Sequence, residues 1–337
     1  PVSTTTPEEI ARLVKAAQNA TEDLRQRMED DYKTLYRREW TDDRWDKGKP
    51  EGYVVYASND PTTFAKRMIA ILSSAKMVAR VPYGANKSDA RKAGEAKEQF
   101  FIGALREGDR LLRQRLQPRL RNTLSFHIVL RGWYAARALL LKLPDGSTRV
   151  DITPFDPLHT VYGVGPEGLA WVVHVTLRTH QEIEAEFGVS LPDLRDMSTG
   201  LETGTEVFDY YDAQFNMVCA RGAWLKEPEP HYSPRLPCVV GMVGPAPHIL
   251  SKDGADKKDG IEALGESIYE PNRAVYDAIN KTLSDRMTLV RRSLDPGYVL
   301  NSSSGTKTLK GNPYRERAEI ALKVGESLTP LQLQAMS

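Results

Sequence analysis

Residues 267–294 read SIYEPNRAVYDAINKTLSDRMTLVRRSL, and this stretch decides the fold of the C-terminal part of the chain. Its apolar side chains recur at every third or fourth position, as Ile268, Val275, Ile279, Leu283, Met287, Val290 and Leu294. That spacing predicts an amphipathic helix from Ile268 to about Ser293, roughly 40 Å long at 1.5 Å per residue. Ser267 and Glu270 match a capping box at its start, and Asp295-Pro296-Gly297 would end it.

The residues around this helix predict strands and loops. After it, Tyr298 to Leu300 is expected to form a strand, residues 301–311 a flexible loop, residues 314–318 a helical turn and residues 320–324 a returning strand. Before it, residues 249–260 are polar and rich in glycine, as a solvated loop requires. Residues 227–248 contain six prolines and little periodicity, which indicates an extended connector.

The first third of the chain is predicted to be helical. Thr6-Pro7-Glu8-Glu9 is a strong helix start, and apolar residues at helical spacing predict one helix from there to about Arg38. Residues 50–61 contain glycine, asparagine and two terminal prolines, and are expected to form a loop. Further helices are predicted over residues 61–75, over 88–117, and after Pro118 up to Gly132.

The period then changes from helix to strand. Short segments rich in β-branched and aromatic residues, separated by turn signals, predict strands over residues 133–143, 148–154, 169–177, 206–211 and 215–220. Residues 179–187 are expected to form a short helix between them. A helical part followed by a sheet indicates the α+β class.

Composition excludes several classes of protein. The chain has 46 Lys plus Arg and 45 Asp plus Glu, so it lacks the basic excess of a tight duplex-DNA binder. No apolar run reaches the roughly 18 residues of a membrane span, and we expect no membrane association. Cys219 and Cys238 stand in neither a disulfide framework nor a zinc motif, which indicates two reduced thiols and no metal.

Local motifs for catalysis or nucleotide binding are weak. Residues 163–168 read GVGPEG and fit GxGxxG, but a strand is predicted after them where a dinucleotide site needs a helix, which favours a hairpin turn. Residues 302–307 lack the spacing of a phosphate-binding loop. The six histidines form no metal-binding pattern and no GxSxG elbow is present, so we expect no catalytic residue and no cofactor.

Two charged regions leave alternatives open. The first is a cluster of six arginines that could bind phosphate or could pair with acidic residues of the same or a neighbouring chain: Arg106, Arg110, Arg113, Arg115, Arg119 and Arg121. The second is the polar side of the long helix, with Lys281, Arg286, Arg291 and Arg292. It would be a solvated surface in a monomer, and in a ring of parallel copies it could line a channel.

Four segments, taken in their order, resemble the portal proteins of siphophages. They are residues 56–61 (YASNDP) with Phe64 and Leu72-Ser73, residues 131–136 (RGWYAA), residues 152–157 (ITPFDP) with Val161, and residues 265–268 (GESI) leading into residues 276–285. In that family they correspond to the entry to the first wing helix, a helix-to-strand step, a strand element and the first stem helix. The order over about residues 50–300 carries the resemblance.

The resemblance implies a portal-like fold with a helical and β-sheet wing, a long stem helix and a small α/β clip. The wing would span residues 1–262, with a helical arm at 1–50, helices at 61–131, a β-rich part at 133–225 and a connector at 226–262. The first stem helix would span 263–294 and the clip 295–331. Residues 332–337 would begin a second stem helix, whose remainder and the crown are absent from this sequence, as expected of a fragment.

The resemblance also implies a function. The chain would assemble into a ring of twelve copies at one vertex of a phage capsid and admit double-stranded DNA during packaging and ejection. Its partners would be the terminase large subunit, head-tail connector or adaptor proteins, and the major capsid protein with its scaffold. It would be found in the virion, and in the host cytoplasm during assembly. ATP would be hydrolysed by the terminase and not by this chain.

The resemblance also implies which residues would form contacts between subunits and with DNA. Packing between stem helices would use Val275, Ile279, Leu283, Met287 and Val290. Candidates for the DNA channel are Lys281, Arg286, Arg291 and Arg292, and candidates for contacts of the clip are Lys307, Lys310, Arg315 and Arg317. The alternatives are another phage head assembly or adaptor protein, and a nucleic-acid-processing enzyme, which would need clustered carboxylates or a phosphate loop.

Overall fold

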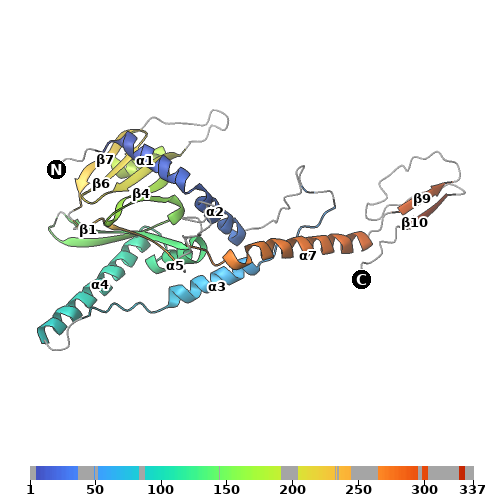
Figure 1. Ribbon diagram of the computed structural model, residues 1–337, viewed down its shortest axis with the longest axis horizontal. Helices are drawn as coiled ribbons and strands as arrows, with labels where there is room; N and C mark the ends of the chain where they lie inside the picture. The colour runs from blue at the N-terminus through green and yellow to red at the C-terminus, as the bar shows by residue number, and fades with distance from the viewer. Residues whose placement is uncertain are drawn as a thin grey trace, which may run out of the picture. The chain divides into compact units, whose positions relative to one another are not determined.

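The computed structural model describes residues 5–36, 49, 52–82, 88–143, 145–190, 204–231, 233, 235–243, 265–294, 298–302 and 326–330. The chain divides into two compact units. Unit 1 comprises Pro1–Leu35 and Thr62–Glu270, and unit 2 comprises Tyr36–Pro61 and Pro271–Ser337. Helices and antiparallel sheets are both present, so the α+β class is confirmed (Figure 1).

Unit 1 contains a five-stranded antiparallel sheet in the order β3-β4-β5-β6-β7. Its strands are β3 (Thr160–Gly165), β4 (Gly168–Arg178), β5 (Thr205–Tyr211), β6 (Phe215–Ala220) and β7 (Ala223–Pro230). Side chains alternate between the two faces of a strand, so Val173 and Val175 of β4 belong to one buried cluster and Val172 to another. Both faces of this sheet are therefore covered.

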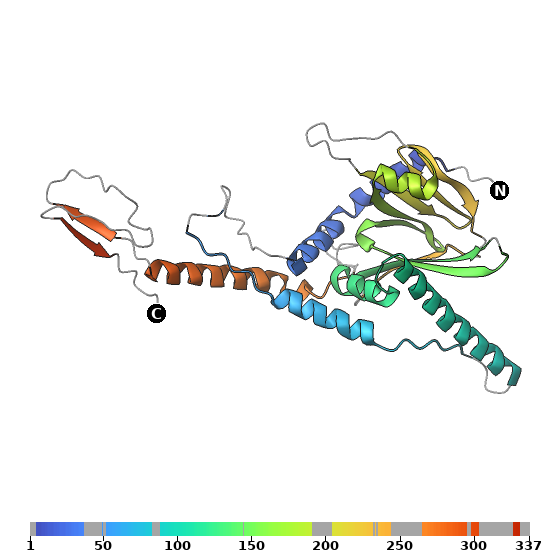
Figure 2. The same ribbon diagram turned by 180° about the vertical axis from the view of Figure 1, so that it is seen from behind.

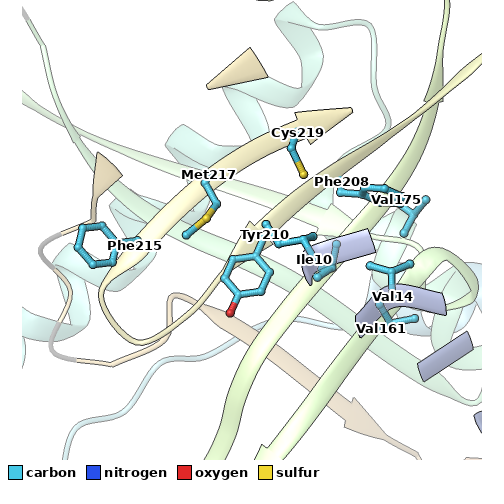
Figure 3. Close-up of a cluster of buried hydrophobic side chains, with 10 residues drawn as sticks. Ile10, Val14, Val161, Val175, Phe208, Tyr210, Phe215, Met217 and Cys219 are labelled. Carbon is cyan, nitrogen blue, oxygen red and sulfur yellow. The ribbon is translucent and has the colours of Figure 1, made fainter. Parts of the chain in front are cut away.

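Helix α1 (Pro7–Ala20) covers the first face. It begins as predicted at Thr6, whose hydroxyl accepts a hydrogen bond from the Glu9 amide at 3.3 Å, while the Glu9 carboxylate accepts one from the Thr6 amide at 3.0 Å. Figure 3 shows Ile10 and Val14 of this helix facing Val161 and Tyr210 of the sheet. All four side chains are buried, and this cluster holds the helix on the sheet.

A three-stranded antiparallel sheet in the order β2-β1-β8 lies against the second face. Its strands are β1 (Trp133–Lys142), β2 (Thr148–Phe155) and β8 (Cys238–Met242). Helices α4 (Ser88–Gln114) and α5 (Leu120–Arg131) contact this sheet in turn. Gly108 of α4 lies against β2, where an added Cβ would come within 3.3 Å of the Ile152 Cβ. Unit 1 is thus a layered structure of α1, two sheets, and α4 with α5 (Figures 1 and 2).

The shorter or peripheral helices complete the described part of unit 1. They are α2 (Glu22–Tyr36), α3 (Asp60–Ser74), α6 (His180–Phe187) and the 3₁₀ turn η1 (Pro157–His159). A second 3₁₀ turn, η3 (Glu270–Asn272), begins at the last residue of unit 1 and lies mostly in unit 2. The hairpin turn predicted at residues 163–168 is present between β3 and β4, where Gly165 pairs with Gly168. The GxGxxG pattern therefore belongs to a hairpin, as predicted.

The described part of unit 2 consists mainly of a long helix, a β-hairpin and the extended residues 53–58. The helix is α7 (Arg273–Leu294), and the hairpin pairs β9 (Tyr298–Ser302) with β10 (Glu326–Pro330). Residues 53–58, far away in the sequence, run along α7. Sequence reasoning placed these residues in a loop and did not predict this association.

Two helix boundaries differ from the predictions. The single helix expected from Pro7 to about Arg38 is two helices that break at Thr21, whose hydroxyl donates to the Ala17 carbonyl at 2.8 Å. The helix expected from Ile268 begins at Arg273. Ser267 therefore does not cap α7; its hydroxyl donates to Asp31 at 2.6 Å and accepts from the Tyr269 amide at 3.2 Å, in a turn that precedes the helix.

Other differences concern strands. β3, β7 and β8 were not predicted, and β8 and the second half of β7 lie in the segment interpreted as a proline-rich connector. Prolines are tolerated there because β7 and β8 are terminal strands of their sheets. The helical turn predicted at residues 314–318 and the strand at 320–324 lie outside the described residues.

Candidate functional site on helix α7

A row of three small polar side chains on α7 binds the segment at residues 53–58. The amides of Val54, Tyr56 and Ser58 each donate a hydrogen bond to this row. The pairs are Val54 to Thr288 at 2.9 Å, Tyr56 to Ser284 at 2.8 Å and Ser58 to Asn280 at 2.8 Å. The two periods match, since two extended residues and four helical residues each advance about 6 to 7 Å.

This contact buries the polar side of α7. Asn280, Ser284 and Thr288 are 3%, 0% and 4% exposed. Buried hydroxyl and amide groups are stable only when hydrogen-bonded, and here the backbone of the segment satisfies them. The hydroxyl of Ser284 also donates to the Tyr56 carbonyl at 3.3 Å, so both backbone groups of Tyr56 point toward the helix.

The segment has two different edges because alternate side chains of an extended chain point in opposite directions. The phenol of Tyr53 donates to the Asp285 carboxylate at 2.6 Å, which places Tyr53, Val55 and Ala57 on the Asp285 side of the polar row. Val54 and Tyr56 then lie on the Leu283 side. The segment is half-buried throughout.

The apolar stripe predicted on this helix is largely exposed in the single chain. Val275, Ile279, Met287 and Val290 are 48%, 38%, 45% and 51% exposed, and Leu283 is half-buried. On an ordinary surface helix the apolar side is buried against the protein core and the polar side is exposed. On α7 the polar side is buried and the apolar side is exposed. The polar row is covered and the stripe is open to a partner.

The four cations proposed for a DNA channel do not share one side of α7. At about 100° per residue, Lys281 and Arg286 are roughly 140° apart around the helix, and Arg291 is on the side of the polar row. Arg286 and Arg291 are exposed and Lys281 is half-buried. Arg292 belongs to α7, but its side chain is outside the described part of the structure, as are Lys307, Lys310, Arg315 and Arg317.

The segments that carry the family resemblance contact one another within their units. In unit 2, Tyr56 and Ser58 bind Ser284 and Asn280, as above. In unit 1, the RGW segment approaches the GESI segment, because a Cβ on Gly132 would lie 1.7 Å from the Gly265 carbonyl oxygen, and the Ile268 amide donates to the Val129 carbonyl of α5 at 2.9 Å. Segments that are well separated in sequence are thus held together by specific contacts.

Two glycines of unit 1 approach each other so closely that neither has room for a side chain. Gly132, after α5, and Gly265 both have φ of +67°, a conformation that favours glycine. A Cβ on Gly132 would lie 1.7 Å from the Gly265 carbonyl oxygen, and one on Gly265 would lie 2.2 Å from the Trp133 indole nitrogen. No other residue fits either position without displacement of the backbone.

An ion pair joins residues 152–157, the third segment of the family resemblance, to Arg131 at the end of α5. Arg131 is buried, donates to the Asp156 carboxylate at 3.2 Å and also bonds the Met28 carbonyl at 2.5 Å. Burial alone would raise the pKa of Asp156, but the charge of Arg131, with contributions from His127 and the Leu158 amide, lowers it. Burial lowers the pKa of the neighbouring His127. These groups serve the packing of α5, α2 and η1.

A second charged cluster lies between the two sheets. The Arg137 guanidinium donates to the Tyr211 phenol and to Asp151, each at 2.6 Å, and the phenol donates to Asp209 at 2.8 Å. Burial raises the pKa of Asp209 and, together with the Asp209 charge, raises that of Tyr211 well above its ordinary value. The cluster connects β1 and β2 of one sheet to β5 of the other, so its hydrogen bonds hold the two sheets together.

The arginine cluster of α4 and α5 makes contacts within unit 1. Arg110 pairs with Glu107 at 2.6 Å and Arg115 with Asp151 at 3.3 Å. Arg113 donates to the Asp109 carbonyl at 3.2 Å and Arg121 to the Ser73 carbonyl at 3.2 Å. Pairing with acidic residues of the same chain, one of the two interpretations of this cluster, therefore holds for Arg110 and Arg115, while Arg113 and Arg121 bond backbone carbonyls.

Two apolar pockets occur in unit 1. One, of about 250 Å³, is lined mainly by Leu24, Met28, Trp133, Val161 and Tyr162. The other, of about 760 Å³, lies between α3, α4 and α5. The polar groups in the second are used structurally, since Asp109 accepts from the Leu120 amide at 2.9 Å.

The described residues contain neither a metal-binding cluster nor a membrane-spanning helix. Among the residues that the structure describes, no group of three or more His, Cys, Asp or Glu side chains could hold a metal ion. No helix in the described ranges is long and apolar enough to cross a membrane.

No protein-family model matches the chain, and no match is found among curated proteins. Its function is therefore inferred from the residues and contacts described above.

Proposed function

We propose that this chain is a subunit of a ring-shaped DNA channel of the tailed-phage portal type. The observation that carries the proposal is the reversed burial of α7, which covers its polar row and exposes its apolar stripe. An exposed stripe on a well-formed helix is a surface for association, and copies of the same chain are the partner that the family resemblance implies.

The ring explains why the stripe remains exposed in one chain. Identical copies that pack head to tail cover each stripe with the next subunit, and the series ends when the ring closes. Obligate interfaces of this kind usually bury more than about 2,000 Å². The stripe of α7 would supply the apolar centre of such an interface through Ile279, Leu283, Met287 and Val290.

The proposed parts follow the family arrangement. Residues 1–262 form the wing, residues 263–294 contain the stem helix and residues 295–331 form the clip. The ring is proposed to admit double-stranded DNA at a capsid vertex, to receive the terminase motor during packaging and to receive connector proteins afterwards. In this role the chain needs neither a catalytic residue nor a cofactor.

The test is the particle mass of the purified chain measured by native mass spectrometry. We expect closed rings of about twelve copies for the unmodified chain. Leu283→Asp places a charge at the centre of the stripe and should shift the material to monomers. Thr282→Asp adds the same charge at an exposed position of α7 about 100° away from Leu283 and off the stripe, and should leave the rings intact.

Circular dichroism spectra should be the same for both variants, because position 283 is only half-buried in the single chain. A folded monomer for the unmodified chain at all concentrations would refute the proposal. Rings that persist unchanged in Leu283→Asp would remove the stripe from the interface.

A further inference from the structure

The sides of α7 differ in composition, and their angular order is set by the position of each residue. At about 100° per residue, Leu283 and Asp285 lie roughly 100° to either side of Ser284. Leu283 is at the centre of the apolar stripe, and Asp285 is at the centre of a side that also carries the exposed Leu289. Around the helix, the arc from Leu283 to Asp285 is therefore about 200° through Ser284 and about 160° the other way.

A closed ring needs two unlike lateral sides on each subunit, because one side must bind the opposite side of the next copy. The angle between these sides is smaller toward the centre of the ring than toward the outside. For about twelve copies the inner angle is about 150°. The 160° arc of α7 meets this requirement, and the 200° arc that contains Ser284 does not.

The segment at residues 53–58 increases the difference between the two arcs. It lies over Ser284 and adds a layer of backbone and side chains to the wider arc only. Helix and segment together form a wedge whose broad edge is the segment. Wedges that stand side by side close a ring with their broad edges outward.

We propose that the side of α7 opposite the polar row faces the centre of the ring and that residues 53–58 face outward. Val275, the first residue of the stripe, lies about 180° from Ser284 and so belongs to the inward side, where it is 48% exposed. The polar inward residues are Thr282, Arg286 and Ser293, which lie within about 40° of one another and about 180° from Ser284. All three are exposed in the single chain. This inference rests on the proposed ring. In that ring, the side of α7 that carries Leu289 binds the apolar stripe of the next copy.

The inward side suits a channel through which DNA moves. It presents two small hydroxyl groups, the Val275 side chain and one guanidinium per copy, so a phosphate meets a single ring of cations at the level of Arg286. Few cations give weak contacts that salt screens easily, and the duplex is not held. Lys281 and Arg291 lie away from this side and are excluded from the lining.

The lateral contact is tested by disulfide cross-linking. Leu289 and Val290 are at the same level on opposite lateral sides and are 52% and 51% exposed. With both changed to cysteine, oxidised rings should give a ladder of covalent multimers, and each single variant should give none. The two native cysteines are buried and contribute little background.

The inward side is tested by photo-cross-linking. A benzophenone maleimide is attached to Thr282→Cys or to Ala57→Cys, rings are assembled with short linear duplex DNA, and the mixture is irradiated. DNA should cross-link at position 282 at least tenfold more than at position 57, roughly the contrast expected between a lining and an outer position.

The outcomes separate this inference from the proposed function. The ladder together with cross-linking at position 282 supports it. Dimers formed by Val290→Cys alone would show stripe-on-stripe contacts and overturn it, as would rings that cross-link DNA mainly through position 57. Material that is monomeric by mass in every variant would refute the ring itself and the inference with it.

Discussion

The contact between Gly132 and Gly265 is the tightest residue-scale constraint in unit 1. Both glycines have positive φ, and the carbonyl oxygen of Gly265 occupies the place of a side chain on Gly132. The contact holds the residues that precede α7 in sequence against the end of α5. A side chain at either position must displace backbone, and backbone in a packed layer yields little.

We expect Gly132→Ala to lower the free energy of unfolding by at least about 3 kcal/mol, the sum of an unfavourable φ and a steric clash. Urea denaturation followed by tryptophan fluorescence measures the change. Gly146→Ala is the matched control, because Gly146 also has positive φ, at +82°, but no atom lies within 4 Å of the added Cβ. It should cost about 1 kcal/mol. Equal losses in the two variants would show that the clash is relieved by local movement.

At the scale of elements, the pairing of residues 53–58 with α7 is the feature that organises unit 2. Three backbone amides of the segment are bound by side chains of the helix, and the intervening residues point their backbone groups away. Amides of Val54, Tyr56 and Ser58 should therefore exchange with solvent more slowly than those of Val55 and Ala57. The pattern is a direct signature of the contact.

Ser284→Ala should weaken this pairing, because it removes both the acceptor for the Tyr56 amide and the donor to the Tyr56 carbonyl. Leaving a buried amide without a partner costs about 1 to 2 kcal/mol, so exchange at Val54, Tyr56 and Ser58 should accelerate about tenfold or more. Hydrogen exchange measured by NMR or mass spectrometry checks this. Thr282→Ala, at an exposed position of the same helix, should leave the exchange rates unchanged. Acceleration in both variants would mean that the helix itself had loosened.

Much of the element order was predictable, for reasons that particular residues show. Thr6 caps α1 through its hydroxyl and Gly132 ends α5 through its left-handed backbone; each acts on the adjacent helix end, and such local signals are present in the sequence. β7 and β8 were missed because their stability comes from pairing with β6 and β1, which local propensity does not encode. Ser267 resembled a cap, but a distant partner, Asp31, uses its hydroxyl.

The site was predictable only in part. The stripe of Val275, Ile279 and Met287 followed from periodicity, and the structure shows it exposed. The polar row of Asn280, Ser284 and Thr288 was passed over because polar residues on a helix usually face water. Its spacing of four residues was a signal, since three small hydrogen-bonding side chains in line can bind alternate amides of an extended segment. The segment that binds it lies more than 200 residues earlier.

At the scale of the whole molecule, the charge distribution must allow a duplex to pass. The chain has a formal net charge of +1, so long-range attraction of DNA is weak. Contacts with phosphate then depend on which side of α7 faces the bore. The arrangement inferred above leaves Arg286 as the described α7 cation on that side.

Neutralising different cations of α7 should therefore have different effects on the binding of duplex DNA to assembled rings. Binding constants measured at a series of salt concentrations give a slope of log K against log salt, and each lost phosphate contact lowers its magnitude by about 0.9. Arg286→Gln should lower the slope, while the combined change Lys281→Gln and Arg291→Gln should not. Ring mass is measured for every variant first, because Lys281 lies about 40° from Asp285, on the side proposed to bind the next copy, and only variants with unchanged ring mass are compared. A reduced slope for Lys281 and Arg291 with none for Arg286 would place the polar row and its segment toward the DNA and reverse the orientation of the wedge.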